Sequence, residues 1–167
     1  TRSNRTFTDE EAKLLDLCLI LHAEHGGGNN SAFATRVLSS SGTDTYAALA
    51  AGIGSLKGPR HGGANIKVVE MLNYLKQDVS DITNEGQVAD FLKNVINRKA
   101  GDGSGLVYGM GHAVYTLSDP REKILKAEAE SFAEKAGFGD EFKALSLIEE
   151  LTPEIFAKEK GQNKKIC

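Results

Sequence analysis

Three of the four histidines stand beside glycine-rich breaks between helical stretches. His25 precedes three glycines, His61 precedes two, and His112 follows Gly111. A histidine at a helix end bordered by glycine can aim its imidazole at a ligand while the backbone comes close. One such histidine alone would more often cap a helix or bond a buried carbonyl. Three in the same setting, on loops where polar residues often carry function, indicate a site.

Arg121 follows a proline in the first turn of a predicted helix. The helix dipole disfavours a cation there, but a guanidinium in that place can bind a carboxylate through two parallel hydrogen bonds. A merely solvated arginine is an equally good interpretation. Imidazoles plus one arginine on glycine-rich loops suit a small anionic carbonyl compound whose oxygens must be polarised. The sequence offers no obvious nucleophile and no catalytic triad.

Two other kinds of site are poorly supported. His22 and His25 could share a helix face, but no His-Glu-x-x-His pattern, paired cysteines or third ligand accompanies them, so we expect no metal. The glycine-rich run at 101–105 is neither a dinucleotide-binding fingerprint nor a phosphate-binding loop with Gly-Lys-Ser/Thr, and it follows no strand.

Helices with recognisable caps must position these residues. Apolar periodicity and capping residues predict them over 8–23, 31–38 (capped by Asn30 or Ser31), 44–56, 65–76, 84–98 (capped by Thr83), 119–136, 140–150 and 152–161. Residues 106–117 have no convincing period and are predicted to form an ordered loop. Gly52 and Gly54 lie inside a predicted helix, where glycine costs about 1 kcal/mol relative to alanine, so close packing against another helix is expected. No stretch alternates with period two, and the predicted fold class is all-α.

Composition narrows the class of protein. The 167 residues carry a net charge of −3, and no basic cluster lies among aromatics, so no nucleic-acid partner is expected. The two cysteines, far apart, favour a reducing, cytoplasmic setting over a disulfide framework. The longest apolar run is far too short to cross a bilayer, and the first residues lack a signal-peptide core, so no membrane association is expected.

At three motifs the sequence resembles the citrate synthase family. The first motif runs from Leu21 to Phe33. The second is the stretch from Leu56 to Asn65, a close match to the family's best-known signature. The third comprises 109–115 together with Asp119-Pro120-Arg121. The motifs stand in the family's order and at its separations, over most of the chain.

The resemblance implies a role for each matching residue. His61 would hydrogen-bond the thioester carbonyl of acetyl-CoA, and His112 would donate to the ketone oxygen of oxaloacetate. His25 and Arg121 would bind the other oxaloacetate oxygens. The backbone of Val107, Tyr108, Gly109, Met110 and Gly111 would lie along coenzyme A. The implied reaction is an aldol-type condensation followed by thioester hydrolysis, giving citrate and CoA as in the tricarboxylic acid cycle. The acyl-CoA is a co-substrate, and neither a metal nor a covalently bound cofactor takes part.

The resemblance also implies how the chain is organised. Residues 1–61 would belong to a large helical domain, including helices of a homodimer interface, and residues 62–167 would form most of a small helical domain. Family members are at least twice as long, so the chain is expected to be a fragment. The family's catalytic aspartate and further substrate-binding arginines would follow Cys167, and the fragment alone is expected to be inactive or nearly so.

Two alternatives stay open at the sequence level. A 2-methylcitrate synthase, which uses propionyl-CoA, would carry the same motifs. A non-catalytic dimerisation or regulatory module could also retain them.

Overall fold

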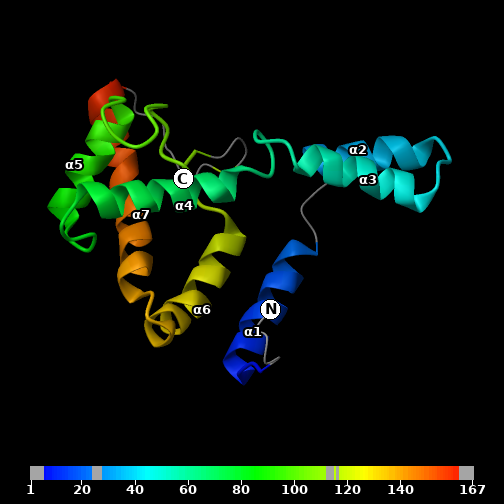
Figure 1. Ribbon diagram of the computed structural model, residues 1–167, viewed down its shortest axis with the longest axis horizontal. Helices are drawn as coiled ribbons and strands as arrows, with labels where there is room; N and C mark the ends of the chain where they lie inside the picture. Colours follow the sequence, from blue (N-terminus) through cyan, green and yellow to red (C-terminus); the bar gives the residue numbers. More distant parts are fainter. Residues whose placement is uncertain (1–5, 24–27, 112–114, 116, 162–167) are drawn as a thin grey trace.

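The computed structural model describes residues 6–23, 28–111, 115 and 117–161. Within these ranges the protein is all-helical and contains no strand (Figure 1). None of the described helices is long and apolar enough to cross a membrane. The helices are α1 (Asp9–His22), α2 (Asn30–Ser40), α3 (Thr45–Leu56), α4 (Ala64–Asp78), α5 (Glu85–Ile96), α6 (Pro120–Ala136) and α7 (Gly139–Lys160). The predicted fold class is confirmed.

Local capping explains where most helices begin. Thr8 and Glu11 form the expected capping box on α1, and Asp119 caps α6 ahead of Pro120. Two predicted caps were wrong. Asn29 caps α2, one residue before the predicted pair, and Asn84 caps α5 in place of Thr83. Thr83 is unavailable because its hydroxyl and its backbone N–H both donate to the Asp81 carboxylate.

The C-terminal part of the chain is one helix where two were predicted. α7 runs through Pro153 without a break. Proline lacks the N–H that would bond the carbonyl four residues earlier and crowds that carbonyl, which usually ends or kinks a helix. Here Ala144, Ile148 and Thr152 are buried along one face of α7, and the Thr152 hydroxyl donates to the Ile148 carbonyl at 2.5 Å. The buried face therefore outweighs the local signal.

The hydrophobic core lies where α5 packs against α7 under α4. α5 contributes five buried side chains at helical spacing, α4 contributes Met71 and Leu75, and α7 contributes Ala144 and Ile148. Val107, from the loop after α5, completes the buried cluster. The loop that carries the predicted CoA contacts is therefore anchored in the core.

The first three helices bury little within the chain. α1 packs only along α6, and α2 packs against α3 as a helical hairpin that extends away from the core (Figure 1). No residue of α1 or α2 is buried, and large apolar side chains such as Leu19, Phe33 and Ile53 are more than half exposed. Exposed apolar area of this extent is typical of association surfaces. The domain boundary at His61 and the dimer interface stay predictions.

The expectation about glycine packing holds for Gly52. A Cβ atom built there would lie 2.2 Å from the Thr35 hydroxyl oxygen and 3.4 Å from the Ser31 carbonyl oxygen, so only glycine lets α3 approach α2 this closely. A Cβ atom at Gly54 would meet nothing within 4 Å. The two glycines, two residues apart on one helix, thus differ in their packing.

We expect Gly52→Ala and Gly54→Ala to change stability in opposite directions. Gly52→Ala should lower the free energy of unfolding by roughly 1–3 kcal/mol, since Thr35 would have to move and give up its hydrogen bond to Ser31. Gly54→Ala should raise it by about 0.5–1 kcal/mol through helix propensity. Circular dichroism during urea unfolding measures both. Equal effects of the two substitutions would contradict the close approach of α2 and α3.

Candidate active site

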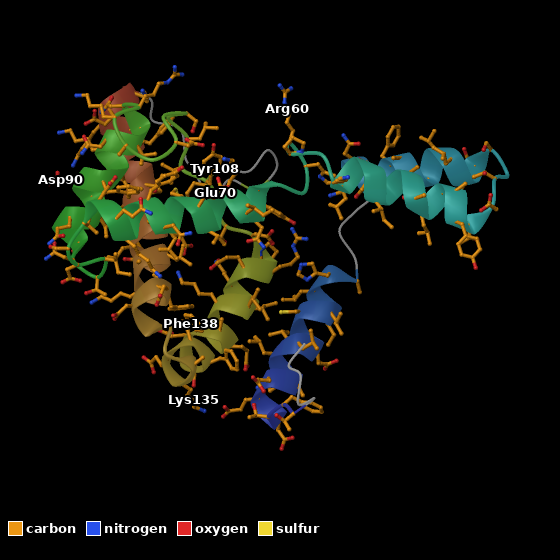
Figure 2. All side chains as sticks on the ribbon, viewed as in Figure 1. Arg60, Glu70, Asp90, Tyr108, Lys135 and Phe138 are labelled. Carbon is orange, nitrogen blue, oxygen red and sulfur yellow. The ribbon has the colours of Figure 1, made fainter. Side chains whose placement is uncertain are left out.

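His61 lies in the tight turn between α3 and α4. Its backbone N–H donates to the Gly58 carbonyl at 2.9 Å, and the Gly62 N–H donates to the same carbonyl at 3.1 Å. A Cβ atom at Gly62 would lie 2.1 Å from the Leu56 carbonyl oxygen, so the turn closes only with glycine after the histidine. The glycine of the motif thereby fixes the backbone that presents the His61 ring. Arg60, one residue earlier, is exposed and points away from the body of the protein (Figure 2).

The imidazole of His61 is held by the first turn of α2. The backbone N–H of Ser31 points to Nε2 of His61 at 3.3 Å and is shared with the Asn29 side-chain oxygen at 3.0 Å. A ring nitrogen that accepts a hydrogen bond carries no proton, so the neutral ring is protonated on Nδ1. The Nδ1–H is then the donor that a ligand would meet. Sequence reasoning missed this use of Ser31, because a backbone donor leaves no trace in residue type.

Arg121 is in the first turn of α6, and Asp119 holds its side chain. Nε donates to the Asp119 carboxylate at 3.0 Å, and a terminal guanidinium nitrogen lies 2.6 Å from the second carboxylate oxygen. The same carboxylate caps α6 by accepting the backbone N–H of Arg121 at 2.9 Å. The negative charge of Asp119 therefore offsets the unfavourable interaction between the Arg121 cation and the N-terminal end of the helix dipole. The sequence identified Asp119 as a cap only.

The predicted CoA loop, residues 107–111, lies against α4. Val107 is buried, Gly109 has a left-handed backbone with φ of 89°, and Tyr108 lies beside Glu70 of α4 (Figure 2). Because α4 begins three residues after His61, this contact brings the loop and the His61 turn to the same helix.

An open groove of about 750 Å³ connects this loop with the start of α6. Its walls include Tyr108, Gly109 and Met110 on one side and Ser118 and Asp119 on the other, with α7 behind. His61 lies outside these walls. The structure therefore brings the loop and the Arg121 partner to one groove, and it places His61 separately, beside α2.

Carboxylates dominate the charged lining of the groove. Among the described residues, Asp119, Glu122, Glu149 and Glu150 line it together with a single cation, Lys126. Burial, together with the nearby Glu149 charge, raises the pKa of Glu122. Burial lowers the pKa of Lys126, but the hydrogen bond to Glu149 at 2.5 Å and the charges of Glu149, Glu122 and Glu150 together outweigh it, so the pKa of the lysine is raised.

The other three histidines cannot be placed in the site from the described residues. His25 and His112 fall outside the described residues. Nδ1 of His22 lies 2.6 Å from the Cys18 carbonyl oxygen, so this ring interacts with its own helix. Within the described ranges no group of three or more His, Cys, Asp or Glu residues could hold a metal ion.

The fold and these elements define a class: an all-helical domain in which a glycine-bounded turn presents an imidazole and the first turn of a capped helix presents a carboxylate-paired arginine. The family model described as the C-terminal domain of citrate synthase matches residues 2–167. The chain belongs to the citrate synthase family.

Individual relatives agree with this assignment. Citrate synthase of Deinococcus radiodurans is 38% identical over 144 residues, which cover 86% of this chain and 35% of that protein. The 2-methylcitrate synthase of Shewanella oneidensis is 40% identical over 129 residues, covering 77% of this chain and 30% of that protein. The crystal structure of citrate synthase from Pyrobaculum aerophilum superposes with a TM-score of 0.72 at 32% identity, covering 95% of this chain and 37% of that one. The chain thus spans about a third of the length of these relatives.

We expect the neutral His61 ring to carry its proton on Nδ1. Long-range ¹H–¹⁵N correlation spectra at about pH 8, where imidazole is ordinarily neutral, should show an unprotonated Nε2. Ser31→Pro removes the donating N–H in a helical first turn, where proline is tolerated, and should let the Nε2–H tautomer appear.

Ala32→Pro is the matched control. It removes the next N–H of the same turn, which bonds Asn29 at 3.4 Å and not His61, and should leave the His61 tautomer unchanged. An Nε2–H tautomer in the unmodified protein would contradict the assigned hydrogen bond.

Proposed function

We propose that the protein containing this chain condenses acetyl-CoA with oxaloacetate, and that this chain supplies the imidazoles, one arginine and the CoA-binding backbone of the site. His61 would act on the thioester and His112 on the ketone, with His25 and Arg121 on the remaining oxaloacetate oxygens. Residues 107–111 would lie along CoA. No metal takes part in this chemistry.

The main support is the hydrogen bond to His61. A fixed backbone donor at Nε2 leaves the ring one outward donor, Nδ1–H, held in a defined direction. A preorganised donor of this kind stabilises the negative charge that develops on a thioester oxygen when the adjacent carbon loses its proton. A freely rotating histidine would have to be oriented during the reaction.

Arg121 supports the keto-acid half of the proposal. Asp119 fixes the plane of the guanidinium by bonding two of its nitrogens, and a planar fork held in place recognises a carboxylate geometrically as well as by charge. Asp119 would therefore orient Arg121, so that the guanidinium binds a ligand carboxylate that approaches from one defined direction.

The 167 residues alone would turn over slowly or not at all. They match about a third of each relative's length, and the resemblance assigns the proton-abstracting aspartate to a segment after Cys167. Losing a general base costs about 10²–10⁴ in rate.

Propionyl-CoA is the alternative thioester, favoured by the similarity to a 2-methylcitrate synthase. One methylene in an apolar pocket discriminates by about 10–200-fold. The ratio of kcat/KM for the two thioesters therefore separates the alternatives.

His61→Ala in the whole protein should lower kcat by at least about 10² because the oriented donor to the thioester is lost. Thiol release from acetyl-CoA in the presence of oxaloacetate measures the rate. His22→Ala is a matched control, since that ring interacts with its own helix, and should stay within about twofold. Unchanged turnover by His61→Ala would refute the role of His61, and near-full turnover by the 167 residues alone would refute their proposed inactivity.

Arg121→Lys should weaken oxaloacetate binding by about tenfold or more, because lysine cannot make the two parallel bonds of a guanidinium. Isothermal titration calorimetry with oxaloacetate measures the affinity. Arg60→Lys changes an exposed arginine and should have no effect. No saturable binding by the unmodified protein would favour the non-catalytic module over the active-site assignment.

A further inference from the structure

A cluster of polar residues joins α4 to the loop that leads to residues 107–111. The Tyr108 hydroxyl donates to the Asp102 carboxylate at 2.6 Å and lies 3.3 Å from the Ser104 hydroxyl. Nζ of Lys67, on the first turn of α4, lies 3.7 Å from the same carboxylate oxygen and 5.8 Å from the centre of the Tyr108 ring. Glu70 holds Lys67 from the other side at 2.7 Å. The cluster therefore has members on both elements.

Asp102 is the centre of the cluster. Its side chain is only 22% exposed, and it accepts the Ser104 backbone N–H at 3.0 Å in addition to the Tyr108 hydroxyl. Hydrogen bonds from Ser104 and Tyr108 lower the pKa of Asp102 to about 2, so the carboxylate is ionised at any physiological pH. Charge-assisted hydrogen bonds of this kind are about twice as strong as neutral ones.

The backbone around Tyr108 has little room to move. Val107 is buried in the core on one side of it. On the other side, a Cβ atom at Gly109 would lie 3.3 Å from a methyl group of Val68, the residue after Lys67 on α4. The loop thus contacts the first turn of α4 through backbone packing and through the Tyr108 side chain, at adjacent positions of both elements.

We propose that Lys67, Asp102 and Tyr108 form a clamp that sets the position of the CoA-binding backbone relative to the His61 turn. Tyr108 is the positioning residue. Its backbone belongs to the loop proposed to lie along CoA, its hydroxyl bonds Asp102, and both its ring and Asp102 lie near Lys67 on the helix that starts three residues after His61. Loosening the clamp would separate the two halves of the acyl-CoA site. This inference rests on the proposed function.

The clamp predicts a specific kinetic pattern. Tyr108→Phe keeps the ring and its packing and removes the hydroxyl. In the whole protein it should raise KM for acetyl-CoA by about 3–10-fold, the size of a typical net hydrogen bond. KM for oxaloacetate should rise less than KM for acetyl-CoA, because Arg121 belongs to α6 and only His112, among the residues proposed to bind oxaloacetate, directly follows the loop. A general loss of structure would change both constants together.

Amide hydrogen exchange tests the clamp without relying on activity. Tyr108→Phe should speed exchange in residues 107–111 by about threefold or more while leaving the α5 core unchanged. Tyr74→Phe is the matched control, because Tyr74 lines the same hollow on α4 and its hydroxyl makes no hydrogen bond within the described residues. Asp102→Asn, which keeps an acceptor for Tyr108, should fall between the unmodified protein and Asp102→Leu.

The outcomes separate the clamp from the function on which it rests. Unchanged exchange in Tyr108→Phe overturns the clamp. Faster exchange with an unchanged KM for acetyl-CoA overturns its positioning role. Absence of turnover with either acetyl-CoA or propionyl-CoA in the unmodified whole protein overturns the proposed function, and the positioning role with it.

Discussion

The packing of α5 against α7 and α4 anchors both the helix that follows His61 and the loop at residues 107–111. The buried face of α5 meets Met71 and Leu75 of α4 and Ala144 and Ile148 of α7. Two candidate loops are joined to this core: the His61 turn leads from α3 into α4, and the loop with residues 107–111 follows α5 and is anchored by Val107. A shift of α4 along α5 would therefore change the position of the His61 turn relative to residues 107–111.

Two carboxylates, Asp102 and Asp119, hold polar side chains near this core in place. Asp102 holds Tyr108 and Lys67, and Asp119 holds Arg121 while capping α6. In both places a carboxylate serves a local turn and a side chain at once. A partly buried charge with several donors is costly to remove, because its partners lose their bonds together. These positions are therefore sensitive to substitutions that look conservative by size.

The sequence predicted the helices well and their junctions less well. Periodicity and caps placed α1, α3 and α6 closely, because those signals are local. Thr83 was wrongly predicted as a cap because sequence spacing does not show that its hydroxyl donates to Asp81. Pro153 was wrongly predicted to separate two helices because spacing does not show that burial of Ala144, Ile148 and Thr152 along one face stabilises α7. The turns beside His61 and Gly109 were recognised from glycine, although their close approaches needed coordinates.

For the candidate site, residue type predicted which groups matter but not what holds them. His61 stood out because three histidines share the same glycine-rich setting, and Arg121 because the helix dipole disfavours a cation in the first turn of a helix. The residues that hold them could not be recognised in the sequence. Ser31 contributes only a backbone N–H, and Asp119 is also an ordinary helix cap. The same limit applies to Tyr108, which appeared only as part of a loop. Its hydroxyl bonds Asp102, six residues earlier, and its ring lies near Lys67 on α4, a helix thirty or more residues away in sequence. Preorganisation is thus a property of tertiary contacts, and a site whose donors are fixed by other elements can keep its motif residues while losing their alignment.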